Sequence, residues 1–233
     1  MFTNHRHHAG LTQEAYRALP FLSNTDLTET KNQALGITRQ PNPQALQFGS
    51  HFHTAVLEPE HYQRTTERLP WQQIEDLAAA VRRQRFCRDL LYRGQAEQTH
   101  TATHEATGLT VKVRPDLTIT SSKTGRVVLV DFKPTSAQDY AHFCGAIELY
   151  DYDRQAALYS DLLGAARFII IGVRKESPFE VWQFEATPAP GLIEQGRKKY
   201  ERLLKVYAQQ PRPVVPTVSV MPAQTCIPTY SRA

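Results

Sequence analysis

The apolar positions in the first third of the chain recur at helical spacing. Residues 23–35 open with the capping residues Ser-Asn-Thr-Asp and stop before a glycine, which predicts a short helix. Residues 44–57 repeat apolar side chains at near-helical intervals and are closed by Pro59. Residues 71–92 form the longest helical candidate. The pattern therefore predicts that the chain begins with a helical segment.

From residue 96 onward the pattern changes to the strand period of two. Residues 96–104 and 109–114 flank an Ala-Thr-Gly turn, and apolar and polar residues alternate in the second run. A further turn at 121–125 leads into the apolar run 127–133. These features predict a hairpin followed by a buried strand near the centre of a sheet.

The rest of the chain mixes the two periods. The pattern predicts, in order, a helix, two strands and a basic helix, at residues 151–163, 167–174, 179–186 and 189–208. The expected fold class is therefore mixed α/β (α+β), with one domain over residues 1–210. A tail with five prolines, residues 211–233, is expected to be extended or disordered.

The composition is that of an ordinary globular protein. Hydrophobic residues make up 41% and charged residues 21% of the 233 residues, which excludes wholesale disorder. The formal net charge of +4 permits an anionic partner without requiring one, because affinity depends on where the charge gathers. Composition alone therefore leaves the function open.

The cysteines and the hydropathy pattern exclude several classes of protein. Cys87, Cys144 and Cys226 form no C-x-x-C pair, so neither a disulfide framework nor a zinc or iron–sulfur cluster is expected. No apolar run reaches the roughly 18 residues of a membrane span. Residues 1–8 lack a hydrophobic signal region and are expected to be a solvated, frayed terminus. We expect a cytoplasmic protein without a membrane partner.

Two carboxylates and an ammonium group lie close together in the predicted sheet. Asp131 and Lys133 are two apart in the strand 127–133, so both side chains point to one face and their apolar neighbours to the other. Asp116 precedes them by a short connection, which lets antiparallel neighbours bring the two acids together. Paired acids of this kind hold Mg²⁺ or Mn²⁺ for phosphodiester cleavage. The alternative is a structural salt bridge.

Two further features could support such a site. Gln155 and Tyr159 are four apart and share a helical face, which suits contacts to phosphate or bases; a surface glutamine and a core tyrosine are the alternative. The segment 48–59 adds a histidine on an otherwise apolar helix. A neutral imidazole there could complete a metal shell, or it could be a satisfied core residue.

Positive charge gathers in two of the predicted helices. The first helix carries Arg82, Arg83, Arg85, Arg88 and Arg93, and the second carries Arg197, Lys198, Lys199, Arg202 and Lys205. Either group could follow a phosphate backbone, or it could be a solvated helix face. His100 and His104 lie close to a hairpin turn and are expected on the surface rather than in a zinc site.

Four blocks of the chain, taken in order, resemble the PD-(D/E)XK nuclease superfamily, and within it the RecE-type (exonuclease VIII-like) branch. They are residues 22–27, 48–53 with 57–59, 108–116, and 130–133 with 152–159. The resemblance covers roughly residues 22–160. It implies a restriction-endonuclease-like fold, in which helices flank a central mixed sheet. It also implies digestion of double-stranded DNA from an end, with Mg²⁺ (or Mn²⁺) as cofactor and 5′-phosphates on the products.

The resemblance also implies a set of site residues. The metal ligands are His53, Asp116, Asp131 and the carbonyl of Phe132, and the catalytic lysine is Lys133. Contacts to DNA or phosphate are expected from Gln155 and Tyr159, the Q-x-x-x-Y pair, and from Arg114. Glu97 resembles an acidic position that supports the metal site, with an exposed strand charge as the alternative.

One residue departs from the family pattern. Pro134 stands where Thr or Ser usually follows the lysine, and it is expected to end strand pairing one residue early. The three scattered cysteines disfavour the related branch that carries an iron–sulfur cluster.

The resulting expectation is an exonuclease of recombination or phage-type DNA processing. A single-strand annealing protein is a possible partner and a homo-oligomer a possible assembly. Two alternatives remain open. One is an endonuclease that uses the same site, and the other is a non-catalytic module for DNA binding or assembly.

Overall fold

The structure, a computed structural model, describes residues 1–38 and 42–210, so the predicted tail lies outside the described residues. The strands are β1 (Phe2–His8), β2 (Gln95–Ala96), β3 (Thr99–His104), β4 (Thr110–Val113), β5 (Leu117–Thr120), β6 (Val127–Thr135), β7 (Ala165–Arg174) and β8 (Val181–Glu185). The helices are α1 (Gln13–Ala18), α2 (Asn24–Ala34), α3 (Pro43–Leu57), α4 (Trp71–Arg83), α5 (Arg85–Arg93), α6 (Tyr140–Leu149), α7 (Tyr152–Leu163) and α8 (Leu192–Gln209).

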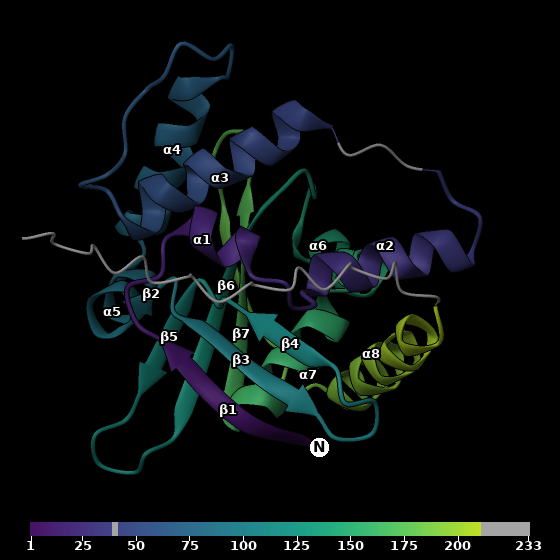
Figure 1. Ribbon diagram of the computed structural model, residues 1–233. Coiled ribbons are helices and arrows are strands. Elements are labelled where there is room, and N and C mark those ends of the chain that lie inside the picture. The colour runs from purple at the N-terminus through teal and green to yellow at the C-terminus, as the bar shows by residue number, and fades with distance from the viewer. Residues whose placement is uncertain (39–41, 211–233) are drawn as a thin grey trace, which may run out of the picture.

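The larger of the two sheets has β6 at its centre (Figure 1). Its order is β2-β5-β6-β7-β8, in which β6 and β7 are parallel and the other neighbours antiparallel. A separate antiparallel sheet has the order β1-β3-β4. The prediction of a mixed α+β fold with strand 127–133 at the sheet centre is confirmed.

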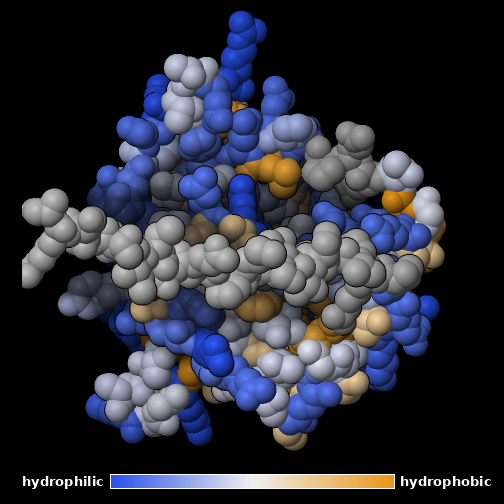
Figure 2. Space-filling model, in the orientation of Figure 1, coloured by the Kyte–Doolittle hydropathy of each residue, from blue (hydrophilic) through white to orange (hydrophobic). Residues whose placement is uncertain are grey.

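Helices cover both faces of the larger sheet. On one face α3, α4 and α5 enclose a core that includes Val130 and Phe132, and they lie toward the top and left of Figure 1. The outer surface over α3 and α4 is mostly hydrophilic (Figure 2). On the other face, Leu129 packs in a second core with α6, α7 and α8. Because side chains alternate along β6, Asp131 and Lys133 project toward α7, as the strand period predicts.

The N-terminal residues do not behave as predicted. They form β1, which pairs antiparallel with β3. The expectations of a frayed terminus and of a chain that begins with helices are therefore wrong. The expectation that His100 and His104 lie on the surface is also wrong, since they are 8% and 2% exposed. They are buried because β3 is the central strand of the small sheet, between β1 and β4.

One helical prediction is wrong in part, and one helix was not predicted. The predicted helix 71–92 is broken at Gln84, whose backbone is extended (φ −73°, ψ 120°). The break turns α5 so that Cys87 and Leu90 enter the core beside β5, and Arg88 Nη1 donates to the carbonyl of Arg82 at the end of α4 (3.3 Å). Helix α6 was not predicted. Its signal lies in its buried residues Phe143, Ala146 and Ile147, which follow i, i+3, i+4 spacing.

The prediction for Pro134 is wrong, because β6 stays paired with β7 as far as Thr135. The backbone N–H of Phe132 points away from β7, toward Asp116. The nitrogen of Pro134, two residues further along β6, faces the same side as that of Phe132. On that side β5 pairs only as far as Val130 of β6, so β5 has no strand residue opposite Pro134. The proline therefore removes no ladder hydrogen bond. Among the helices described, none has the length and apolarity that a bilayer crossing needs.

Candidate active site

The two predicted acids meet where β5 begins beside β6. Leu117 of β5 pairs with Val130 of β6, so Asp116 lies opposite Asp131 in the antiparallel register. Both carboxylates are buried, at 6% and 3% exposure. The pairing of β5 with β6 therefore brings the two acids together, as the short connection between them predicts.

Lys133, Asp131 and Gln155 form a closed polar triangle. Lys133 Nζ lies 2.7 Å from Asp131 Oδ2 and donates to Gln155 Oε1 over 3.0 Å. Gln155 Nε2 in turn donates to Asp131 Oδ1 at 2.6 Å. Helix α7 therefore supplies an amide that orients both the acid and the ammonium group.

His53 reaches the same place from α3. Its Nδ1 lies 3.3 Å from Asp116 Oδ1, and its Nε2 donates to the carbonyl oxygen of Phe132 at 3.0 Å. Asp116 Oδ2 accepts the backbone N–H of Phe132 at 2.6 Å. The ring thus bridges two oxygens, the Asp116 carboxylate and the Phe132 carbonyl, that the resemblance assigns to a metal.

Glu97 adds a third carboxylate at the edge of the sheet. Ligand atoms of His53, Glu97 and Asp116 all lie within 4.8 Å of one another. Glu97 follows β2 in a left-handed conformation (φ 51°), and its N–H donates to the carbonyl of Asp116 at 3.1 Å. Its carboxylate accepts from Arg114 Nε at 2.5 Å. The charge is therefore directed inward rather than exposed on a strand.

The electrostatics of the cluster are those of crowded carboxylates. Burial and the nearby Asp116 carboxylate raise the pKa of Glu97 to about 7, against the opposing effect of Arg114. Burial alone would lower the pKa of His53, but the Asp116 carboxylate raises it to about 9. Burial likewise disfavours the Lys133 ammonium, yet Asp131 and Asp116 raise its pKa. Both bases are thus held in their cationic forms by the acids around them.

The donor set fits a hard divalent cation. Carboxylate and carbonyl oxygens with one imidazole suit Mg²⁺ or Mn²⁺. The two N–H groups of the protonated His53 ring face Asp116 and the Phe132 carbonyl, so a cation that replaced one ring proton would contact the ring and one of these oxygens. Asp131 Oδ2 is buried and, apart from the Lys133 ammonium, has no hydrogen-bond partner among the residues described. The cluster of ligand atoms within 4.8 Å consists of His53, Glu97 and Asp116, whereas the Asp131 carboxylate is turned toward Lys133.

The other predicted contact residues are less open to a ligand. Arg114 donates to Glu97, to the carbonyl of Leu11 and to Thr99, and its side chain is 8% exposed. Tyr159 is 6% exposed and packs against Phe168 in the core. Gln155 belongs to the polar triangle.

Tyr152 is a site residue that the sequence reading missed. Lys133 Nζ lies 4.9 Å from the centre of its ring. A cation over an aromatic face is attracted to it. The residue stands three positions before Gln155, which was a signal that it shares the same helical side.

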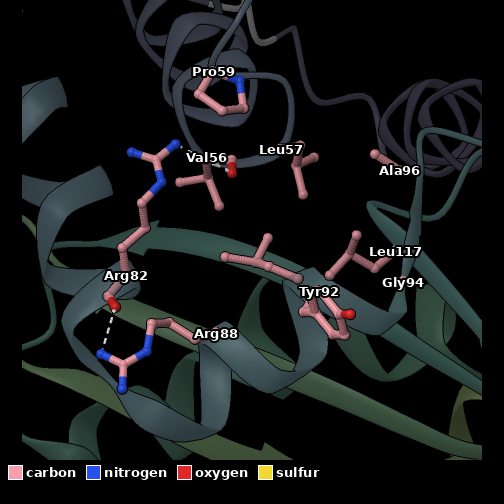
Figure 3. Close-up of a pocket in the computed structure, with 10 residues that line it drawn as sticks. Val56, Leu57, Pro59, Arg82, Arg88, Tyr92, Gly94, Ala96 and Leu117 are labelled. Atoms are coloured by element: carbon pink, nitrogen blue, oxygen red, sulfur yellow. Dashed lines mark hydrogen bonds between the residues drawn. The ribbon is translucent and has the colours of Figure 1, made fainter.

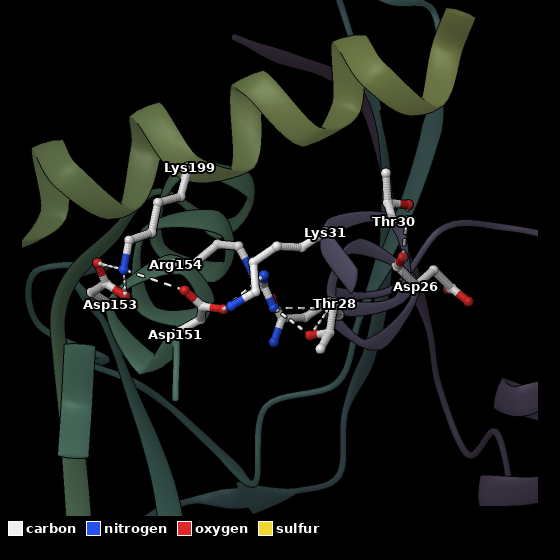
Figure 4. A network of polar contacts seen from close by, with 9 residues as sticks. Asp26, Thr28, Thr30, Lys31, Asp151, Asp153, Arg154 and Lys199 are labelled. Atoms are coloured by element: carbon white, nitrogen blue, oxygen red, sulfur yellow. Dashed lines mark hydrogen bonds and ion pairs between the residues drawn. The ribbon is translucent and has the colours of Figure 1, made fainter. Parts of the chain in front are cut away.

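A network of charged residues fixes the start of α7 (Figure 4). Arg154, 1% exposed, donates to Asn24, Thr28 and Asp151. Lys31 of α2 and Lys199 of α8 also pair with Asp151. The network ties three helices together beside Gln155. The sequence reading missed it, because charged residues in an amphipathic helix are typical of a solvated face.

Several basic residues of the two predicted clusters are engaged in hydrogen bonds and ion pairs within the protein. Arg82 donates to the carbonyls of Ala55 and Val56. On α8, Arg197 pairs with Asp161, and Lys199 pairs with Asp153 of α7. Other members of both groups, including Arg83 and Lys205, are exposed.

A pocket of about 500 Å³ borders the acidic end of the sheet (Figure 3). It is lined by Val56, Leu57, Pro59, Arg82, Arg88, Leu91, Tyr92, Gly94, Ala96 and Leu117. Ala96 and Leu117 are the chain neighbours of Glu97 and Asp116. Its arginines, Arg82 and Arg88, cap backbone carbonyls, which leaves a mostly apolar wall.

Comparison with known proteins places the chain among related folds. The model of a family described as "PDDEXK-like domain of unknown function (DUF3799)" matches residues 25–216. The crystal structure of a "putative exonuclease" from Eubacterium rectale superposes with a TM-score of 0.59 at 17% identity, over 84% of this chain and 86% of that one. This similarity concerns the fold.

A second structure is more distant. The phage related exonuclease from Haemophilus somnus 129PT superposes with a TM-score of 0.44 at 12% identity, over 85% of this chain and 82% of that one. No curated protein sequence matches the chain.

Proposed function

Because the chain belongs to the PDDEXK-like domain family, we propose that it is a deoxyribonuclease that depends on a divalent metal ion. The observation that carries the proposal is the convergence of His53, Glu97, Asp116, Asp131 and Lys133 beside β6. Segments far apart in the sequence deliver these groups to one place. A purely structural ion pair needs two charges, not three acids and two bases.

Under this proposal the metal would be held by His53, Asp116, Asp131 and the Phe132 carbonyl, with Glu97 as a supporting acid. A divalent cation there would polarise a phosphoryl oxygen and lower the pKa of a coordinated water. It would also relieve the repulsion from Asp116, which together with burial raises the pKa of Glu97 to about 7.

Lys133 would act as a fixed positive charge. Its ammonium is held by Asp131 and Gln155 at 2.7 and 3.0 Å. Because the acids raise the pKa of Lys133, it stays protonated. A preoriented cation stabilises the negative charge that develops on the phosphate in the transition state. Gln155 would be a positioning residue for Lys133 and Asp131.

The finer proposal is an exonuclease that uses Mg²⁺, digests double-stranded DNA from an end and leaves 5′-phosphates. A role in recombination or phage-type DNA processing, an annealing protein as partner and a homo-oligomer stay predictions from the resemblance. The DNA contacts expected of Arg114, Gln155 and Tyr159 also stay predictions. For Arg114, the pairing with Glu97 favours an indirect role through that acid.

The test is digestion of matched linear and covalently closed circular DNA. With Mg²⁺ or Mn²⁺, the linear duplex is expected to be degraded to 5′-phosphorylated products, while the closed circle stays intact. Excess EDTA is expected to stop the reaction, because the carboxylates cannot supply the lost metal's charge. Products are read on sequencing gels with either end labelled.

Other outcomes decide between the alternatives. Cutting of the closed circle would favour an endonuclease with the same site. Salt-sensitive DNA binding that is indifferent to Mg²⁺, with no digestion of any substrate, would favour a non-catalytic binding module and refute the proposed function.

A further inference from the structure

A patch of exposed apolar side chains lies where α6 ends and α7 begins. Leu149 is 71% exposed and Tyr150 is 56% exposed. Single exposed apolar residues are common on protein surfaces, and a contiguous exposed apolar patch is a candidate for ligand contact. The patch is separate from the residues assigned above to metal binding and phosphate chemistry.

The patch is connected to Lys133 through two aromatic rings. The Tyr150 and Tyr152 ring centres are 5.8 Å apart, with an angle of 33° between their planes. The Tyr152 ring in turn lies 4.9 Å from Lys133 Nζ. Two successive contacts therefore lead from the ammonium to an exposed aromatic ring. A phosphate beside Lys133 would bring its own nucleotide, or the next, over this ring.

The backbone that presents Tyr150 is held firmly. The Tyr150 N–H donates to Ala146 at 3.0 Å, and the next residue, Asp151, adopts a left-handed conformation (φ 56°). The Asp151 carboxylate is bound by Lys31, Arg154 and Lys199 (Figure 4). A platform fixed in this way loses little conformational entropy when a flat ligand stacks on it.

We propose that Tyr150, together with Tyr152 and Leu149, forms a stacking subsite for an unpaired nucleobase next to the phosphate that is cleaved. The proposal rests on the proposed function and specifies its substrate. A base inside the duplex has both faces covered by its neighbours and a terminal pair has only its outer face open, whereas an unpaired base can turn out of the stack and lie on an aromatic side chain. The nucleotide beside the cleaved bond would therefore be separated from its complement.

Binding is tested with the full-length protein in Ca²⁺, on a duplex whose frayed terminal nucleotide is 2-aminopurine. Stacking on Tyr150 is expected to quench the 2-aminopurine fluorescence. Tyr150→Ala is expected to weaken binding of this DNA about 10- to 100-fold and to abolish the quenching, because an aromatic platform contributes strongly to single-strand binding. Tyr150→Phe, which keeps the ring, is expected to bind like the wild type. Thermal unfolding checks that all variants are folded.

Tyr140→Ala is the matched control, because Tyr140 is a 45% exposed tyrosine at the opposite end of α6. Wild-type quenching in Tyr150→Ala, an equal loss in Tyr140→Ala, or an equal loss in Tyr150→Phe would each overturn the subsite. The binding assay involves no cleavage, so the two proposals can fail separately. Quenching that depends on Tyr150, without digestion in Mg²⁺, would refute the nuclease and keep the subsite. Digestion without such quenching would do the opposite.

Discussion

Replacing Lys133 by alanine is expected to slow DNA cleavage by about 10²- to 10³-fold at saturating Mg²⁺, the usual effect of losing one preoriented group that stabilises transition-state charge. The ammonium lies 2.7 Å from the buried Asp131 carboxylate on a side chain that is 18% exposed, and a neutral water molecule in its place would not supply the lost charge. Asp131→Asn is expected to cause a loss of similar size, because it removes a proposed metal ligand and the partner of Lys133. Single-turnover rates on a linear duplex measure both effects.

Two further variants make this result specific. Lys133→Met keeps the aliphatic stem and is expected to lose as much activity as the alanine variant. Lys123→Ala removes an exposed lysine from the turn that joins β5 to β6, at the far end of β6, and is expected to leave the rate unchanged. Wild-type rates for Lys133→Ala and Asp131→Asn would rule out the assigned site.

Arg154→Ala is expected to lower the free energy of unfolding by about 3–5 kcal/mol, since it removes the buried donor of Asn24 and Thr28 and one of the three cations that neutralise Asp151. Arg154 contacts Asn24 at 2.9 Å, Thr28 at 2.6 Å and Asp151 at 3.3 Å. Because α7 also carries Gln155, the variant is expected to cleave DNA more slowly even where it is fully folded. Urea unfolding followed by circular dichroism measures the stability.

The matched control is another arginine in an ion pair. Arg167 pairs with Glu185 at 2.7 Å, but its side chain is 47% exposed. Exposed pairs contribute about 0–1 kcal/mol, so Arg167→Ala is expected to change stability little. Equal losses in the two variants would mean that the buried network does not hold α7 in place.

The centre of the site could be predicted because strand periodicity determines which side chains share a face. Asp131 and Lys133 are two apart in an apolar strand, and both point toward α7. The proximity of Asp116 followed from its short connection to the same strand. These inferences need only local geometry, which the sequence carries directly.

Other features depend on contacts that no local pattern encodes. Strand β1 is largely exposed and is held by backbone pairing with β3, so it has no apolar alternation to read. Arginine is a residue type usually found on the surface, and Arg154 is buried only because α2 and α7 meet around it. Glu97 faces the acids because its own backbone is left-handed (φ 51°).

Glu97 and Asp131 stand differently toward the proposed metal site. Glu97 belongs to the tight cluster with His53 and Asp116, whereas Asp131 faces Lys133. Both acids lie beside Asp116. The backbone N–H of Glu97 donates to the Asp116 carbonyl, and Asp131 lies opposite Asp116 in the strand register. A cation that draws in Asp131 would have to compete with the Lys133 ammonium for that carboxylate.

Crystals soaked in Mn²⁺ and measured at the manganese absorption edge test the central claim most directly. The account predicts an anomalous peak within ligand distance of Asp116, Asp131 and His53, next to the Phe132 carbonyl. A fully occupied peak elsewhere, or no peak among these four groups at saturating Mn²⁺, would contradict it.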